Sequence, residues 1–545
     1  MNVRILAIND FHGHLEPPAG SNGLVLAAAD DPLASSVDAR RLDSGLALVP
    51  TGGAAYLGAH LRRLRAESPN TVFVSAGDLT GASPLISNLF GDEPVVLVMN
   101  RLGLDFEGVG NHDFDRGWHE LLRLQKGACA RAECDGGAFP GASFAYLAAN
   151  VIETATREPI FPPFAIRDLG GARVAFIGET LRQTPQITSA SAVRGLSFED
   201  EADAANALVP TLLGQGVSAI VLLLHQGGVQ SPGGTYDSCQ GLSGDVLPIL
   251  KKLDPAIHIV VSAHAHQAYD CDVDGRVVTS AGSYGRIITT IDLTIDAGAH
   301  RIVAVRAKNV PVTHDVVPDP QVAAIVAEYA EKARGIATRV VGYLRHDLVG
   351  SARMAGRASC ETPLGDVIAD AMREATGADL ALMNPGGIRS DLVAKRPGRP
   401  DFAVTYADAF EVQPFGNRLV VMTLTGADLR SLLEAQFTGR PEPRILQVSN
   451  GFSYRYAYDR AGRSAVLSDL RLKGQLVLPT SRLRVAVPSF LAAGGDGFER
   501  FISGIDPKEG PVDVDALLAF LGRASSSSSP FDPAPATRIE GDGCR

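Results

Sequence analysis

The stretch VRILAINDFHGHLEP, residues 3–17, places an apolar run directly before a cluster of carboxylate and imidazole side chains. Its first six residues, VRILAI, are apolar at nearly every position rather than at alternate positions. Such a run is typical of a strand in a largely parallel sheet that is covered on both faces. Asp10 and His12 therefore follow the point where the chain leaves a buried strand.

Similar runs recur through residues 1–315, separated by turns or by segments with helical periodicity such as residues 52–68 and 200–215. The runs are TVFVSAG (71–77), RVAFIG (173–178), AIVLLL (219–224) and IHIVVSA (257–263). This alternation predicts a layered α/β domain over residues 1–315.

The alternation of apolar runs and polar clusters stops after residue 315. Residues 316–340 begin with prolines and continue as a helical pattern, which we interpret as a connector helix. Residues 341–523 have strand-like and helical segments of their own and predict a second, smaller α/β domain. Residues 524–545 are rich in Ser and Pro, so we expect a loose, low-complexity tail.

Length and composition restrict the class of protein. A chain of 545 residues with 45% hydrophobic residues is long enough for two cores. Its apolar runs are too short to span a bilayer, so we expect no membrane span. The net charge of −11 disfavours nucleic-acid polymers as partners, but a local cluster of metals or arginines can still attract a small anion.

The six cysteines have no Cys-x-x-Cys spacing, which argues against a zinc ribbon or a redox motif. Their loop-like settings favour disulfides in an oxidising compartment, with unpaired thiols as the alternative. We expect the pairs Cys129–Cys134, Cys239–Cys271 and Cys360–Cys544, and the third is the least supported. We also expect a periplasmic or extracellular protein whose signal peptide is not part of this sequence, because only MNVR precedes the residues ILAI of the first strand.

Polar residues of the types that bind metal ions follow several of the strand-like runs. They are Asp10, His12, Asp78, Asn111, His112, Asp115, His225, His264 and His266. Ligands bind at the carboxyl edge of such sheets, and mixed imidazole, carboxylate and amide ligands suit Zn, Mn, Fe or Co. A single Asp there is usually a turn or helix cap, but recurrence at so many strand ends favours a metal centre. The number of ligands indicates two ions that share one carboxylate and clamp a phosphoryl group.

The motifs LAINDFHGH, SAGDLTGASPL, GVGNHDFDRG, LLLHQGG and VVSAHAHQ resemble, in order, those of the calcineurin-like metallophosphoesterases, and within them the secreted 5′-nucleotidases. The resemblance implies a four-layer sandwich of two mixed sheets flanked by helices, and two divalent ions, Zn or Mn. It implies that Asp10, His12 and His266 hold one ion, and that Asn111, His225 and His264 hold the other. Asp78 would bridge them, and His112 and Asp115 would form the catalytic pair. His14 and His119 match no ligand position, so we interpret them as structural or surface residues.

The second domain carries GSARMAGRASCETPLGD, MNPGGIRSDL, VQPFGNRL and VPSFLAAGGDGFE, which resemble the substrate half of the same nucleotidases. By this resemblance Arg353, Arg357 and Arg389 contact the phosphate or carboxylate-like edge of the substrate. Phe415 and Phe490 would sandwich a base, and Asn384, Asn417 and Asp496 would hydrogen-bond base or ribose. Without the resemblance, core packing is the simpler interpretation of the two phenylalanines.

We therefore predict a monomeric or weakly dimeric 5′-nucleotidase that releases phosphate from nucleoside 5′-monophosphates by in-line attack of a metal-bound hydroxide. His112, oriented by Asp115, would stabilise the developing charge. Nucleoside di- and triphosphates and UDP-sugars are further expected substrates. Three alternatives remain: a 2′,3′-cyclic nucleotide 2′-phosphodiesterase with 3′-nucleotidase activity, a thiosulfohydrolase, and a non-catalytic nucleotide-binding protein.

Overall fold

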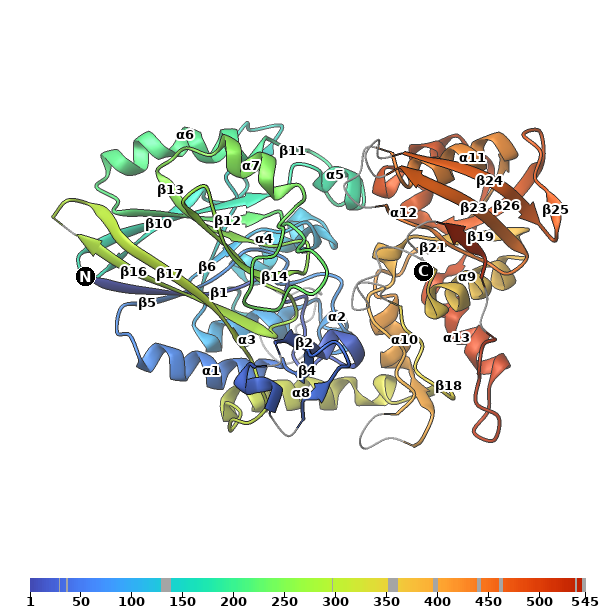
Figure 1. Cartoon of the computed structure of the whole chain (residues 1–545), viewed down its shortest axis with the longest axis horizontal. Helices are drawn as coiled ribbons and strands as arrows, with labels where there is room; N and C mark the ends of the chain where they lie inside the picture. The colour runs from blue at the N-terminus through green and yellow to red at the C-terminus, as the bar shows by residue number, and fades with distance from the viewer. Residues whose placement is uncertain are drawn as a thin grey trace. The chain divides into compact units, whose positions relative to one another are not determined.

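The computed structural model describes residues 1–28, 30–35, 38–128, 139–296, 298–350, 361–395, 400–438, 443–459, 464–534 and 537–541. The chain divides into two units, whose elements are drawn in Figure 1. Unit 1 comprises Met1–Pro18 and Gly23–Lys332, and unit 2 comprises Ala19–Asn22 and Ala333–Arg545.

Unit 1 contains two mixed six-stranded sheets. The first has the order β17 (Arg301–Pro311), β16 (Ile287–Asp296), β1 (Asn2–Ile8), β5 (Thr71–Ser75), β6 (Phe106–Gly108) and β7 (Ala145–Leu147). The second has the order β14 (Ala268–Val273), β15 (Arg276–Ala281), β13 (Ile257–Ser262), β12 (Ala219–His225), β10 (Ala172–Thr180) and β9 (Phe164–Leu169). In the first sheet β1, β5, β6 and β7 run parallel, and in the second β10, β12, β13 and β15 do.

The two sheets pack face to face, and helices cover their outer faces. Val3, Ile5 and Ala7 of β1 join the core between the sheets, whereas Leu6 and Ile8 join the core under the helices. The first outer face is covered by α1 (Ala54–Ala66), α3 (Glu93–Leu102) and α4 (Trp118–Lys126), and the second by α6 (Glu201–Gly214) and α7 (Val246–Lys252). Because both faces are buried, the strands need apolar residues at successive positions. The predicted four-layer sandwich is confirmed.

Shorter elements complete unit 1. They are β2 (Leu24–Ala27), β3 (Arg40–Arg41), β4 (Ala47–Pro50), α2 (Leu85–Asn88), β8 (Val151–Glu153), α5 (Thr184–Ile187) and β11 (Leu196–Phe198). A disulfide joins Cys239 to Cys271 of β14, as predicted. The other four cysteines, and with them the other two predicted pairs, lie outside the described residues.

Unit 2 is built on a five-stranded sheet with the order β22 (Gln447–Val448), β19 (Leu380–Met383), β26 (Arg482–Pro488), β21 (Arg418–Thr425) and β27 (Ile505–Val512). One face packs against α9 (Pro363–Thr376) and α13 (Asp513–Ala524). The other packs against α11 (Gly426–Ala435) and a sheet of β25 (Gln475–Leu476), β24 (Ser464–Leu472), β23 (Phe452–Asp459) and β28 (Ile539–Gly541). The remaining elements are β18 (Val340–Tyr343), β20 (Ala403–Thr405), α10 (Tyr406–Val412) and α12 (Ser489–Ala492). The predicted smaller α/β fold is therefore present.

Helix α8 (Pro320–Ala337) lies inside the expected connector, and the two units divide within it, between Lys332 and Ala333. The chain also enters unit 2 once near the N-terminus, at Ala19–Asn22, and then returns to unit 1. There Ser21 donates from its backbone nitrogen and its hydroxyl to Asp391 Oδ2, at 3.1 and 2.6 Å. Nothing in the local sequence pattern predicted that Ala19–Asn22 belongs to unit 2.

The expectation of a loose tail is wrong for its described residues. The backbone of Phe531 donates to Tyr343 O at 2.8 Å, and β28 pairs in parallel with β23. Arg538, mostly buried, donates to both carboxylate oxygens of Asp370, at 2.9 and 2.8 Å. Composition indicated a loose tail because Ser and Pro dominate the segment. In the described part, the hydrogen bonds of Phe531, β28 and Arg538 nevertheless attach the segment to unit 2.

Candidate metal centre and substrate site

The predicted metal ligands of unit 1 gather at the carboxyl edge of its two sheets. Asp10 and His12 follow β1, Asp78 follows β5, and Asn111 follows β6. His225 ends β12, and His264 and His266 follow β13. Because these strands run parallel within each packed sheet, their carboxyl ends bring residues that are far apart in sequence into one place.

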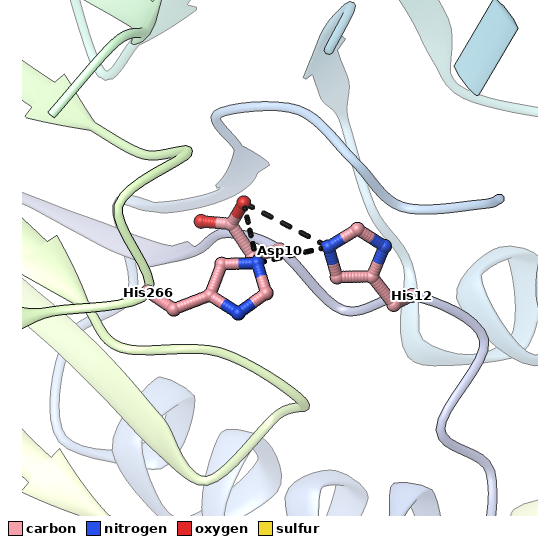
Figure 2. Close-up of side chains that lie close together, drawn as sticks. All are labelled: Asp10, His12 and His266. Carbon is pink, nitrogen blue, oxygen red and sulfur yellow. Dashed lines mark hydrogen bonds and ion pairs between the residues drawn. The ribbon is translucent and has the colours of Figure 1, made fainter. Parts of the chain in front are cut away.

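Three side chains form a first candidate ligand group. Asp10, His12 and His266 each offer one atom, and these atoms lie within 4.8 Å of one another. His12 Nε2 lies 3.0 Å from His266 Nε2, and Asp10 Oδ1 lies 3.5 Å from His266 Nε2 and 4.0 Å from His12 Nε2. Figure 2 shows the three side chains pointing toward one another.

A second group consists of Asp78, His225 and His264, whose ligand atoms also lie within 4.8 Å of one another. His225 Nε2 is 3.1 Å from Asp78 Oδ2 and 3.2 Å from Asn111 Oδ1. Asn111 is thus beside the second group, and its amide oxygen is a further candidate ligand.

Asp78 connects the two groups. Its Oδ2 lies 3.1 Å from His225 Nε2 of the second group and 3.6 Å from His12 Nε2 of the first. This oxygen is fully buried and has no hydrogen bond of good geometry to any described residue. An unsatisfied buried carboxylate oxygen is costly unless another partner, such as a cation, approaches it. The donor set and this oxygen together fit two divalent ions with Asp78 between them.

Backbone carbonyls orient two of the imidazoles. His12 Nδ1 lies 2.9 Å from Gly81 O, and His225 Nδ1 lies 2.9 Å from Ala76 O. A carbonyl only accepts, so each Nδ1 carries a proton and each Nε2 faces the candidate site with its lone pair when the ring is neutral. Asn9, which sequence reasoning did not single out, supports Asp10 by donating to its Oδ2 at 2.7 Å.

The backbone at this centre is unusual. Asp10, His12, Asp78, His264 and His266 all have positive φ, between 47° and 66°. Left-handed conformations are uncommon for residues with a Cβ and concentrate at functional sites, where they cost of the order of 1–3 kcal/mol each. The loops therefore adopt unfavourable backbone conformations that orient these five side chains toward the centre.

The charges of the centre interact strongly. Burial raises the pKa of Asp10 to about 7, although the charge of His225 acts against this. Burial would also raise the pKa of Asp78, but His225 and His112 outweigh it and hold that pKa below its usual range. Burial lowers the pKa of His225, but the Asp78 carboxylate outweighs it and raises that pKa to about 9. In the absence of a cation, a proton on His225 thus balances Asp78.

The predicted catalytic pair lies beside the metal centre. His112 Nδ1 is 3.1 Å from both carboxylate oxygens of Asp115, and Ala82 N donates to Asp115 Oδ2 at 2.9 Å. The His112 side chain is 15% exposed, so it is accessible to a ligand. Its ring centroid is 5.2 Å from that of His12, which places it within reach of the same ligand.

Besides Asn9, sequence reasoning missed two further residues of the centre, Asp113 and Tyr284. Asp113 is buried and accepts from the backbones of Asp78, Thr80 and Gly110 at 2.8–3.0 Å, so it ties two ligand-bearing loops together. Its position between two predicted site residues in GNHDFD was the available signal. Tyr284 packs its ring against His12, His14 and His266, at centroid distances of 5.9, 4.1 and 5.3 Å. His14 is buried and His119 is exposed, as expected of structural and surface residues.

The described residues of unit 2 that were predicted to bind substrate gather at one edge of its five-stranded sheet. Asn384 follows β19, Asp496 follows β26 and α12, and Phe415 and Asn417 precede β21. Asn384 Nδ2 donates to Asp496 Oδ2 at 2.8 Å, and Asn417 Oδ1 accepts from Phe490 N at 3.3 Å.

The two phenylalanines are only partly buried, although Phe490 borders a core cluster. The guanidinium of Arg389 lies over the ring of Phe415, 5.8 Å from its centroid. Its Nη2 is buried and has no hydrogen-bond partner among the described residues, which suits an oxyanion ligand. Arg353 and Arg357 lie outside the described residues.

Comparison with known families finds two matching family models along the chain. The calcineurin-like phosphoesterase family matches residues 3–268, and the 5′-nucleotidase C-terminal domain matches residues 340–502. The chain belongs to the 5′-nucleotidase family. Both halves of this family architecture are therefore present, in the order that the motifs indicated.

Relatives and solved structures extend over nearly the whole of this 5′-nucleotidase-family chain. It is 32% identical over 525 residues to endonuclease YhcR of Bacillus subtilis, covering 95% of this chain and 39% of that protein. It is 28% identical over 548 residues to a cell wall protein of Listeria monocytogenes, covering 93% and 65%. The crystal structure of a 5′-nucleotidase precursor from Thermus thermophilus superposes with a TM-score of 0.78 at 26% identity, covering 99% of each chain.

The chain thus spans 39% and 65% of the lengths of the two curated relatives. Among the described helices of this family member, none combines the length and the apolar character that crossing a membrane requires.

Proposed function

We propose that this protein is a dinuclear metal-dependent hydrolase that releases phosphate from nucleoside 5′-monophosphates. The observation that carries the proposal is the buried Asp78 Oδ2, which lies between His12 of one ligand group and His225 of the other. A shared carboxylate between two imidazole-rich groups is the arrangement that a two-metal phosphoesterase needs.

In this proposal Asp10, His12 and His266 hold one divalent ion, and Asn111, His225 and His264 hold the other, with Asp78 shared. Zn or Mn suits this mixture of nitrogen and oxygen ligands. Such ions lower the pKa of bound water toward neutrality and neutralise charge on a phosphoryl group.

His112 supplies the protein's own contribution to the chemistry. Hydrogen bonding of its Nδ1 to Asp115 turns Nε2, at the opposite edge of the ring, away from the carboxylate. A protonated Nε2 donates to a phosphoryl or leaving-group oxygen as negative charge develops there. Asp115 keeps the ring in that orientation through its two contacts with Nδ1.

The residues of unit 2 select the nucleotide. The partly exposed rings of Phe415 and Phe490 would stack on a base, which is worth about 1–3 kcal/mol and accepts any base. Asn384, Asn417 and Asp496 would hydrogen-bond base or ribose, and Arg389, together with Arg353 and Arg357, would bind anionic oxygens.

Nucleoside di- and triphosphates and UDP-sugars fit the same combination of groups, as do 2′,3′-cyclic and 3′-nucleotides. A second candidate is phosphodiester cleavage in nucleic acid, because a relative 32% identical to this chain is named an endonuclease. The net charge of −11 weighs against a long polyanion. A thiosulfohydrolase is the weaker alternative, since a sulfur oxyanion has no use for stacked aromatics.

The test is phosphate release by Mn²⁺-loaded protein from AMP, ATP, UDP-glucose, 3′-AMP and 2′,3′-cyclic AMP, with single-stranded DNA cleavage assayed in parallel. We expect AMP turnover that falls at least 100-fold in His112→Ala, as for loss of a general acid or charge-stabilising donor. His119→Ala, at an exposed histidine on the neighbouring helix α4, is the matched control and should retain full activity. Cleavage of only cyclic nucleotides or DNA would refute the proposed substrate class.

We further propose a periplasmic or extracellular location. The Cys239–Cys271 disulfide requires an oxidising compartment, and one relative is a cell wall protein. Fractionation of the source cells, with detection of this chain by antibody, checks it; recovery in the cytoplasmic fraction would contradict it.

A further inference from the structure

A short loop near the N-terminus, Ala19–Asn22, makes hydrogen bonds to a proposed substrate segment of unit 2, and we call it the clamp loop. Asn22 Nδ2 donates to the backbone oxygen of Arg389 at 2.9 Å. Ser21 donates to Asp391 Oδ2 twice, from its backbone nitrogen at 3.1 Å and from its hydroxyl at 2.6 Å. Because Ala19–Asn22 is itself part of unit 2, these contacts lie within one unit.

The clamp loop is closed at its base. Gly20–Gly23 forms a 3₁₀ turn, and a side chain at Gly23 would collide with the backbone oxygen of Pro18, so the two ends of the loop touch. Thr51 N donates to Gly23 O at 2.8 Å, which fixes the end of the loop that leads into β2. A short loop with fixed ends has little conformational entropy left to lose when its tip makes hydrogen bonds.

Arg389 lies in an irregular segment, so its backbone direction depends on contacts with other parts of the chain. The segment follows a 3₁₀ turn at Pro385–Gly387. The backbone nitrogen of Arg389 donates to Val412 O, at the end of α10, at 2.9 Å. Asn22 binds the backbone oxygen, so both hydrogen-bonding groups of this backbone position are held.

The guanidinium of Arg389 has weak contacts of its own. Its Nη1 lies 3.4 Å from Gly386 O, which is long for a hydrogen bond, and its ring contact with Phe415 is 5.8 Å from the centroid. Its buried Nη2 has no hydrogen-bond partner among the described residues. The direction of this side chain is therefore set largely by the backbone that carries it.

The clamp loop also satisfies a carboxylate two residues from Arg389. Asp391 is buried, and besides the two bonds from Ser21 it accepts from Gly350 N on Oδ1 at 2.8 Å. Three donors satisfy this carboxylate without Arg389. The guanidinium is then available to a ligand rather than paired with its neighbour in the chain.

We propose that Asn22 and Ser21 are positioning residues that hold Arg389 for the anionic oxygens of the substrate. Asn22 acts through the backbone oxygen of Arg389, and Ser21 acts through Asp391. The inference rests on the proposed function, in which Arg389 binds anionic oxygens. It assigns the clamp loop a part in specificity: phosphorylated nucleotides are bound in preference to uncharged nucleosides.

The experiment measures kcat and KM for AMP, and the inhibition constant of adenosine, with Mn²⁺-loaded protein. Asn22→Ala should raise KM for AMP about tenfold with little change in kcat, because it weakens a contact made equally in the ground and transition states. The inhibition constant of adenosine, which has no anionic oxygen, should not change.

Further variants separate the hydrogen bond from the shape of the side chain. Asn22→Asp is nearly isosteric but cannot donate, so it should raise KM at least as much as Asn22→Ala. Asn22→Gln keeps an amide donor and should recover part of the loss. Ser21→Ala leaves the backbone donor in place and should raise KM by a smaller factor.

Asn206→Ala is the matched control, because Asn206 Nδ2 also donates to a backbone oxygen, that of Lys252, at 2.9 Å in unit 1. It should change neither constant. An unchanged KM in the Asn22 variants, or equal weakening of AMP and adenosine, would overturn the inference while leaving the nucleotidase proposal intact. A wild type that hydrolyses no AMP would overturn the proposed function, and the inference with it.

Discussion

Metal binding at the candidate centre should release a proton from His225. The Asp78 carboxylate raises the pKa of His225 to about 9 against the effect of burial, whereas the ordinary value is 6.5. His225 is then charged at pH 7 in the metal-free protein, but an imidazole must be neutral to bind a cation. A pH two units below the pKa leaves about 1% of the ring neutral, which weakens apparent metal affinity about 100-fold, or about 2.7 kcal/mol.

The sign of the pH dependence of metal affinity follows from the direction in which the pKa of His225 is shifted. The stabilisation that protonated His225 contributes to the metal-free protein is complete below pH 6.5 and is lost as pH rises through about 9. Metal affinity should change in the opposite sense, rising about tenfold per pH unit between pH 7.5 and 8.5 and levelling above about pH 9, with a steeper rise below pH 7, where Asp10 must also lose a proton.

The assay is calorimetric titration of metal-free protein with Mn²⁺ at pH 6.5, 7.5 and 8.5, in pairs of buffers with different ionisation enthalpies. The buffer dependence of the heat counts the protons released. His258→Gln, at an exposed histidine of β13, is the control and should leave the proton count unchanged. Affinity that does not vary with pH, with no proton release at pH 7.5, would refute the reasoning about Asp78 and His225.

Two further substitutions test the Arg538–Asp370 ion pair of unit 2 and the close packing of Gly110 against Asp78 at the metal centre. Arg538→Gln leaves the partly buried carboxylate of Asp370 without its bidentate partner and should destabilise unit 2 by about 1.5–3 kcal/mol, measured by chemical unfolding. Arg523→Gln, which breaks an exposed ion pair, should cost at most about 1 kcal/mol, and an equal loss in both variants would contradict this account. Gly110→Ala places a Cβ against the Asp78 side chain and should reduce the metal retained after dialysis, whereas Gly214→Ala, with open space around it, should not. Full metal content in Gly110→Ala would show that the two loops adjust freely.

Much of unit 1 could be predicted from the sequence because burial leaves a local signal. Strands covered on both faces need successive apolar residues, and β1, β5, β12 and β13 each appear as such a run. The polar residues that follow them are visible for the same reason, since they interrupt apolar runs. The tail after residue 523 misled this reasoning, because composition does not reveal that Arg538 finds a carboxylate partner in α9.

The contacts within each site depend on the order of strands in the sheets, which no local pattern encodes. Asp10 and His266 are 256 positions apart in sequence, and they meet because β1 and β13 belong to two sheets packed face to face. The position of Asp78 Oδ2 between His12 and His225, and the raised pKa of His225, are consequences of that packing.

The ring of Tyr284 could not be assigned to the site from the sequence, because it meets His12, His14 and His266 only after folding. Residue types and their places at strand ends thus came from the linear chain, through burial and periodicity. The tertiary structure decided which atoms face one another and which pKa values their groups have. Distances between side chains and the loss of water around them arise only when the sheets pack.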